Sequence, residues 1–236
     1  EFFMNKIKHI LLFGFLAFLI SCQGKTPKEE KSDKSKPSTF SSFYVRFLQK
    51  ENQTEATATF QNGMTQQSAK SLKIEKGVFF HNGNMVERTI PNIGTRYQAF
   101  YSGSFSETYR FQFQDPLKGK IDHIVQMNPI LDFSFESEIS KSKGTILSWE
   151  GPPLNKNESL VFLIQDAKNK SISFVLKGKT NTSKMNIGNK HLSQLETGSA
   201  TIYLVRKQTA AEQKPNLIIL TEMEFYTFEK NITIVL

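Results

Sequence analysis

The sequence predicts an all-β protein made of two tandem β-sandwich domains, which follow a signal peptide and a disordered tether. Apolar and polar residues alternate along many short segments, which is the pattern of strands with one buried face. The chain contains 21 Phe among 236 residues, and aromatic side chains suit the half-buried surface of a pleated sheet. Turn residues separate these segments at the short intervals typical of sandwiches and barrels, and no window has the period of a long amphipathic helix.

Residues 41–130 are expected to form the first sandwich. Its initial strand is predicted from Phe43, Val45 and Phe47, which share one face. Further strands are expected near residues 56–60, 72–80, 109–113 and 121–127. The segment His81–Asn84 contains Asn-Gly, which adopts the positive φ angles of a tight turn, so it is predicted to form a hairpin tip.

Residues 131–236, which follow the strand-breaking pair Asn128-Pro129, are expected to form the second sandwich. Strands are predicted near residues 133–135, 146–149, 160–164, 172–176, 201–206, 217–220, 223–228 and 232–236, with one helical turn near 192–195. The nearly continuous apolar run at 160–164 is typical of a strand that is buried on both faces.

Five segments of this second half form a recognisable combination. The strand Ile146–Trp149 is followed by the turn Gly151-Pro152 and the apolar run Leu160–Ile164. In Leu192–Gly198, two Leu and a Gly recur at every third position before the strand Thr201–Arg206. The combination resembles immunoglobulin-like and fibronectin type III-like sandwiches, and the resemblance implies their two-sheet fold. The single Cys of the chain excludes the disulfide of antibody domains.

The first residues have the layout of an export signal, with a basic head at Met4–His9 and an apolar stretch at Ile10–Ile20. The stretch is too short for a transmembrane helix, which needs about 20 apolar residues. Its end, Leu19-Ile20-Ser21-Cys22, resembles the lipobox of bacterial lipoproteins. The resemblance implies cleavage before Cys22 and acylation of its sulfur and amine. Residues 1–21 are thus expected to be a signal peptide that starts at Met4.

Residues 22–40 are expected to be a lipidated, flexible tether. The segment from Gln23 to Thr39 has no aliphatic or aromatic residue, so it has nothing to bury against the entropy cost of ordering. Gln23 favours the outer membrane over the inner one. Lys28-Glu29-Glu30 resembles the acidic export signals of some surface-exposed lipoproteins. The alternative is that this segment is a solvated spacer that carries no sorting signal. The whole chain resembles β-rich lipoproteins of Bacteroidetes-type envelopes, a resemblance that implies no particular activity.

No cofactor, metal or nucleic acid is expected. The formal net charge is +8, but the basic residues are spread out, whereas nucleic-acid binders gather them in a patch with aromatic residues. The four His residues, at positions 9, 81, 123 and 191, lack the spacing of metal ligands. No nucleophile or phosphate-loop motif is complete, so the protein is predicted not to be an enzyme.

One aromatic group falls outside the expected strands and is the candidate ligand surface. Tyr97, Phe100 and Tyr101 lie close together in the sequence, and exposed aromatic rings stack on sugars. Tyr97 and Tyr101 are the candidate ligand-binding residues. The alternative is that these rings fasten their segment to the sandwich. Trp149 could also stack on a sugar, but its position in a predicted strand indicates a core residue.

Three functions are compatible with these observations. The first is a membrane-anchored envelope lipoprotein that acts as a non-catalytic binding or scaffold module, with an envelope protein or a polysaccharide as partner. The second is a glycan-binding lipoprotein of a nutrient-uptake system, with Tyr97 and Tyr101 as its platform. The third is a hydrolase whose carboxylates come together only in the folded chain.

Overall fold

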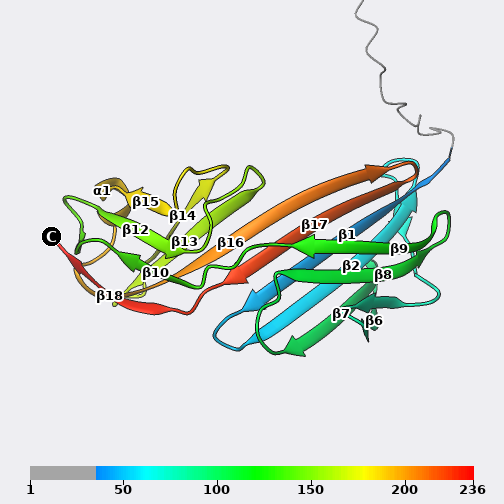
Figure 1. Cartoon of the computed structure of the whole chain (residues 1–236), viewed down its shortest axis with the longest axis horizontal. Coiled ribbons are helices and arrows are strands. Elements are labelled where there is room, and N and C mark those ends of the chain that lie inside the picture. Colours follow the sequence, from blue (N-terminus) through cyan, green and yellow to red (C-terminus); the bar gives the residue numbers. More distant parts are fainter. Residues whose placement is uncertain (1–35) are drawn as a thin grey trace, which may run out of the picture. The chain divides into compact units, whose positions relative to one another are not determined.

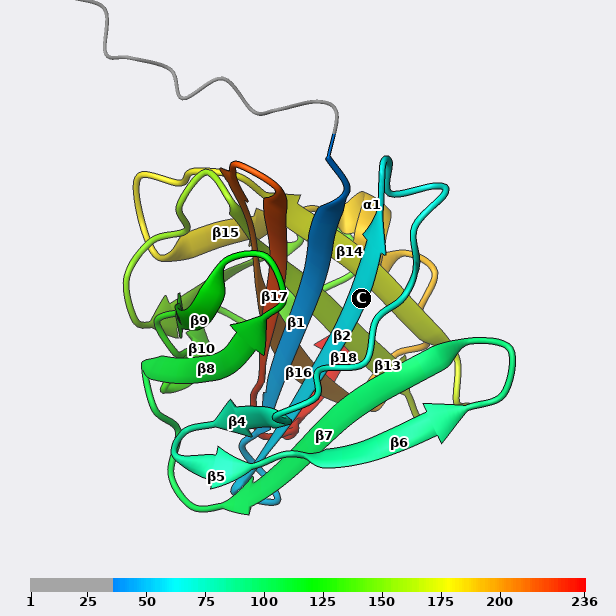
Figure 2. The same cartoon turned by 90° about the vertical axis from the view of Figure 1, so that its right-hand side faces the viewer.

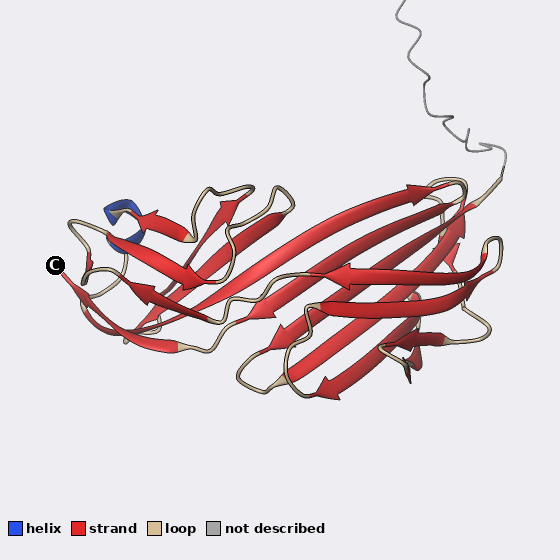
Figure 3. Cartoon of the chain, viewed as in Figure 1, coloured by secondary structure: helices blue, strands red, loops and turns tan. Residues whose placement is uncertain are grey.

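The computed structural model describes residues 36–236, and nearly all of their regular structure is β-strand (Figure 3). The all-β prediction is confirmed. Within this part of the chain one short helix occurs, α1 (Asn189–Leu192), which ends where the helical turn predicted near 192–195 begins. No helix in residues 36–236 has the length and apolar character needed to cross a membrane. Cys22, the signal peptide and most of the tether lie outside the described residues.

The strands follow one another along the chain as labelled in Figure 1. Those of the first half are β1 (Ser38–Leu48), β2 (Gln53–Gly63), β3 (Lys70–Ser71), β4 (Val78–Phe80), β5 (Gly83–Asn84), β6 (Val86–Ile90), β7 (Gly94–Ser102), β8 (Thr108–Asp115) and β9 (Gly119–Gln126). Those of the second half are β10 (Asp132–Phe135), β11 (Ile139–Ser140), β12 (Thr145–Glu150), β13 (Glu158–Asp166), β14 (Ser171–Lys177), β15 (Lys184–Ile187), β16 (Gly198–Lys214), β17 (Leu217–Tyr226) and β18 (Lys230–Val235).

The second sandwich has the two-sheet, immunoglobulin-like arrangement that the sequence resemblance implies. One sheet has the order β10-β12-β15, and the other has the order β11-β18-β16-β13-β14. The order β10-β12-β15 corresponds to the A, B and E strands of immunoglobulin-like sandwiches, and β18-β16-β13-β14 corresponds to their G, F, C and C′ strands. The short strand β11 pairs with β18 at the edge of the second sheet. Leu147, Trp149 and Phe162 lie in its core, and each is almost completely buried.

The first sandwich has an aromatic core between two sheets. One sheet contains β17-β1-β2-β7-β6, and the other has the order β5-β4-β8-β9. The ring of Phe43 on β1 stacks on that of Phe111 on β8, with the ring centres 4.4 Å apart. At the tip of the β4–β5 hairpin, His81 and Asn82 have φ angles of 48° and 70°. The predicted turn therefore occurs one residue earlier than the Asn-Gly pair.

Two long strands join the sandwiches into one sheet. The first half of β16 pairs with β13 and β18, and its second half, Val205–Lys214, pairs with β17. β17 in turn runs parallel to β1, and Figures 1 and 2 both place these strands side by side. Residues 205–226, which the expected boundary at 130/131 assigns to the second domain, thus complete the sheet of the first. Without β17, β1 would be an unprotected edge.

Candidate functional site

Tyr97 and Tyr101 lie on β7 and point to the inner face of the sheet. Tyr97 is fully buried, and its hydroxyl accepts a hydrogen bond of 2.8 Å from the backbone N–H of Ile74. The Tyr101 hydroxyl donates to the carbonyl of Phe80 at 2.9 Å, and a Cβ on Gly83 would clash with it. Tyr97 therefore fastens the segment before β4 to the sandwich, and Tyr101 fastens the β4–β5 hairpin, which is the alternative role expected for these rings. Tyr97 has no face open to a ligand.

The outer face of the same sheet carries polar residues in rows that cross neighbouring strands. The register places them opposite one another. One row contains Lys207 of β16, Glu224 of β17, Arg46 of β1 and Glu55 of β2; the next contains Thr209, Glu222, Tyr44 and Thr57; the third contains Ala211, Leu220, Ser42 and Thr59. Since directly opposite side chains point the same way, these residues form one surface.

Glu224 is the centre of a hydrogen-bonded network on this face. Its carboxylate accepts hydrogen bonds from Tyr44 at 2.5 Å and Tyr226 at 2.8 Å, and it pairs with Lys207 at 2.5 Å. Lys207 also pairs with Glu222 at 2.9 Å. The network links three adjacent strands and leaves each of these charges with a partner.

The network holds its members in fixed protonation states. Burial disfavours the ionised form of Glu224, but hydrogen bonds from Lys207, Tyr44 and Tyr226 outweigh it and lower the pKa of the carboxyl. The hydrogen bond to Glu224 raises the pKa of Lys207 above its usual range. Burial, followed by the hydrogen bond to Glu224, raises the pKa of Tyr44 strongly and that of Tyr226 to about 12. At neutral pH the network is therefore a carboxylate, an ammonium and two neutral phenols.

A groove runs over the second and third rows, and we call it the sheet-face groove. Its first chamber, about 710 Å³, is lined by Ser42, Phe43, Tyr44, Thr57, Thr59, Asn157, Thr209, Ala210, Ala211, Leu220, Thr221 and Glu222. Six of these twelve residues carry a hydroxyl group, and Glu222 is the only ionised side chain among them. β17, β1 and β2 are paired on both sides beneath it, so their backbone groups are occupied, whereas β16 has β17 as its only strand partner from Thr209 onward. Recognition over the three central strands therefore depends on side chains.

A second chamber of about 600 Å³ continues the groove over β13 and β14. It shares Asn157, Thr209 and Glu222 with the first chamber, so the two are continuous. Its lining adds Lys156 and Lys177 together with Lys207. The groove therefore changes along its length from a hydroxyl surface to a cationic one.

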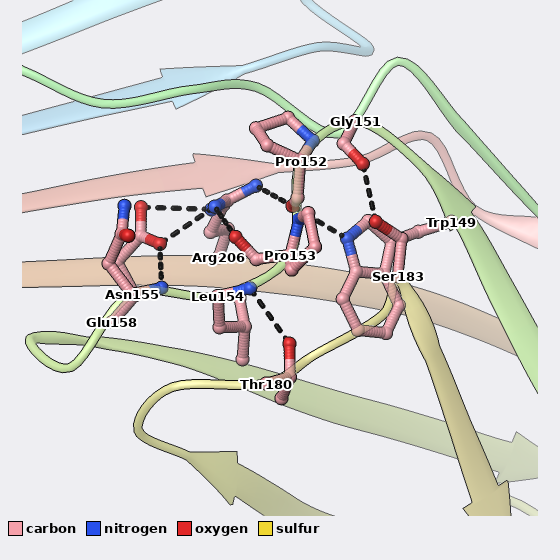
Figure 4. Close-up of polar contacts among 10 residues, drawn as sticks. All are labelled: Trp149, Gly151, Pro152, Pro153, Leu154, Asn155, Glu158, Thr180, Ser183 and Arg206. Atoms are coloured by element: carbon pink, nitrogen blue, oxygen red, sulfur yellow. Dashed lines mark hydrogen bonds and ion pairs between the residues drawn. The ribbon is translucent and has the colours of Figure 1, made fainter.

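A buried ion pair holds the loop that forms one wall of the groove. Arg206 and Glu158 are both almost completely buried, and their Nη2 and Oε2 atoms are 2.7 Å apart (Figure 4). The guanidinium also donates to the carbonyls of Pro152 at 3.1 Å and Pro153 at 3.2 Å. Oε2 of Glu158 accepts from the backbone N–H of Asn155 at 2.7 Å. The strands β13 and β16 thereby fix the loop that carries Lys156 and Asn157.

The histidines do not come together. His123 stacks on Phe43 inside the first sandwich, whereas His191 stacks on Phe174 in the second. Burial lowers the pKa of His123. In residues 36–236 no group of three or more His, Cys, Asp or Glu side chains is arranged to hold a metal ion.

Sequence reasoning missed the residues of the groove. Alternation along β2 puts Thr57 and Thr59 on the face opposite Ala56, Ala58 and Phe60, but nothing in one strand shows which other strands share that surface. The alternation of Tyr97, Ala99 and Tyr101 was the signal for β7.

Comparisons with known proteins add no family. No protein-family model matches the chain, and no curated protein matches it. Among solved structures, it is similar to dimeric latent PorU from Porphyromonas gingivalis, with 10% identity, a TM-score of 0.32, and coverage of 90% of this chain and 21% of that one. It is also similar to a tetra-tandem repeat in the extending region of a large adhesion protein, with 12% identity, a TM-score of 0.28, and coverage of 81% and 49%. The chain thus spans a fifth to a half of those structures.

Proposed function

We propose that this protein is a lipid-anchored envelope protein that binds an extended glycan in the sheet-face groove without transforming it. The observation that carries the proposal is the hydroxyl lining of the groove, supplied by Ser42, Tyr44, Thr57, Thr59 and Thr209. Hydroxyl groups both donate and accept hydrogen bonds, which matches the hydroxyl groups of sugars.

The state of the backbone favours a glycan over an extended peptide. A peptide that joins a sheet needs a free strand edge. β17, β1 and β2 each have a partner on both sides at the groove, and β16 lacks a second strand partner only beyond Gln208, where the N–H of Thr209 still donates to the carbonyl of Asn157 at 3.1 Å. A peptide side chain would need an apolar pocket, and the first chamber offers only small or partly covered apolar groups such as Ala211 and Leu220.

The protonation states favour binding over catalysis. A general acid or base works best with a pKa near the working pH. The pKa of Lys207 and those of Tyr44 and Tyr226 are raised away from neutrality, and that of Glu224 is lowered away from it. The network is suited to keeping the floor of the groove rigid and its charges constant.

Position in the cell forms the second part of the proposal. The lipobox Leu19–Cys22 supports acylation of Cys22, with residues up to about 40 as tether, and Gln23 favours the outer membrane. Two or more acyl chains hold a protein firmly. Feeding cells a labelled fatty acid should label the protein, and Cys22→Ala should abolish the label. Persistent labelling of the variant would refute the anchor.

The groove is tested with a pair of tryptophan variants of the purified full chain. Thr59→Trp fills the first chamber, whereas Thr89→Trp adds the same bulk at an exposed position on β6, outside the groove. On a glycan array, the parent and the Thr89 variant should bind the same glycans, and the Thr59 variant should lose them by about tenfold or more. If the parent binds no glycan, the proposed function fails.

A further inference from the structure

We infer that the ligand is an acidic glycan whose anionic groups lie in the second chamber of the sheet-face groove. The inference rests on the proposed function and specifies the class of its ligand. It is carried by the distribution of charge along the groove, which is uneven.

The positive charge of the second chamber is available to a ligand. Lys156 and Lys177 line the chamber and are exposed. Within residues 36–236, neither side chain has an ion pair or a hydrogen bond, whereas Lys207, the third lysine of the chamber, is engaged by Glu222 and Glu224. Two ammonium groups therefore face the chamber with no counterion from the described protein.

The acidic residues of the chamber do not offset this charge. Glu158 lies beneath the surface and is neutralised by Arg206 at 2.7 Å. Glu222 is paired with Lys207 at 2.9 Å. Counting Lys156, Lys177, Lys207 and Arg206 against Glu158, Glu222 and Glu224 leaves a formal excess of one positive charge, and both unpaired groups are cationic. An anionic ligand group is attracted to such a surface.

The first chamber requires the rest of the ligand to be uncharged and rich in hydroxyl groups. Its only ionised liner is Glu222, and its polar groups are hydroxyls and the Asn157 amide. The two chambers share Asn157, Thr209 and Glu222, so one continuous chain can occupy both. A polysaccharide in which neutral sugars alternate with uronic acids has both properties, with hydroxyl groups on every unit and carboxylates at intervals.

The test compares acidic glycans with neutral counterparts of the same backbone. Oligosaccharides of hyaluronate and of unsulfated chondroitin, in which neutral sugars alternate with uronic acids, are each titrated calorimetrically into the full chain at low salt together with their carboxyl-reduced forms. At least one acidic form should bind about tenfold more tightly than its reduced form, since the reduced form cannot form the exposed ion pairs with Lys156 and Lys177. The difference should shrink in high salt because exposed charges are screened.

Variants assign the effect to the chamber. Lys156→Gln with Lys177→Gln should remove most of the preference for the acidic form and leave the affinity for the reduced form unchanged. The control, Lys143→Gln with Lys190→Gln, removes two exposed lysines outside the groove and should keep the preference.

The possible outcomes distinguish a failure of the inference, that the glycan is acidic, from a failure of the proposed function, that the groove binds a glycan. Equal binding of the acidic and reduced forms overturns the inference while the proposed function stands. Binding of polyglutamate as tightly as the acidic glycans, with the same dependence on Lys156 and Lys177, overturns the assignment to a glycan. If neither form of any glycan binds here and none binds on the array, the proposed function fails as well.

Discussion

The two sandwiches differ in how much of their structure lies in their own stretch of sequence. The second sandwich closes its sheets with strands from residues 132–235, in an immunoglobulin-like order, and it has the only Trp of the chain in its core. The first sandwich has a core of stacked Phe rings and depends on β17, which lies between two strands of the second in the sequence. The difference teaches that a sandwich that looks independent in sequence can need a distant hairpin to cover its edge.

Breaking the buried ion pair at the junction should have the largest effect. Glu158→Ala leaves the charge of Arg206 buried without its partner, so the free energy of unfolding should fall by about 4 kcal/mol. Urea unfolding followed by Trp149 fluorescence measures it. Glu138→Ala, at an exposed site, is the control. The double variant Glu158→Leu with Arg206→Met should recover most of the loss. A single variant as stable as the parent would contradict the role given to the pair.

A cavity in the first sandwich tests whether the two regions unfold together. Phe111→Leu removes about three buried carbons, which should lower the free energy of unfolding by about 2 kcal/mol. Because β16 belongs to the sheets of both sandwiches, Trp149 fluorescence in the second should report the same shift as circular dichroism of the whole chain. An unchanged Trp149 transition beside an earlier loss of β-structure would show that the sandwiches unfold separately.

The Glu224 network should make the shared sheet sensitive to alkali. The pKa values of Tyr44 and Tyr226 are raised in the folded chain, that of Tyr226 to about 12. Their contribution is thus complete below the unfolded pKa of about 10 and is lost as pH rises through the folded values. Tyr44→Phe should cost about 1 kcal/mol at neutral pH and make the alkaline loss shallower. Denaturant unfolding between about pH 8 and pH 11 measures both, and an equally steep loss in the variant would exclude Tyr44 as a source.

The exposed ion pair of the second sandwich should have the smallest effect. Lys184 and Glu136 lie on β15 and beside β10, and both side chains are largely open to water. Lys184→Ala should change the free energy of unfolding by less than about 0.5 kcal/mol. Compared with Glu158→Ala in the same assay, it separates the effect of burial from that of charge pairing. A decrease of several kcal/mol in the free energy of unfolding would contradict the small contribution expected of an exposed pair.

Local patterns were sufficient to predict most strands and the second sandwich. Phe43, Val45 and Phe47 share a buried face as expected, and Trp149, Leu192 and Leu195 lie in the core. These positions are determined by alternation and by short spacing, which act within a few residues. The positions of the strands could therefore be found without knowing their partners.

Pairing between distant strands could not be predicted. The later part of β16, from Lys207 to Lys214, lacks apolar alternation and is mostly exposed, so nothing local marks it as a strand. It is a strand because β17 pairs with it. The groove has the same origin, since Tyr44, Thr57 and Thr209 become one surface only through the register of four strands.

The overlap on β16 also limits how the chain can vary in length. Residues Val205–Gln208 pair with β13 on one side and β17 on the other. Because side chains alternate between faces, the loss or gain of one residue there would turn every following side chain to the opposite face. Arg206 would leave its carboxylate, and the groove rows would turn inward. We therefore expect insertions and deletions in the turns and not within β16, because the length of this strand sets the register of both sandwiches.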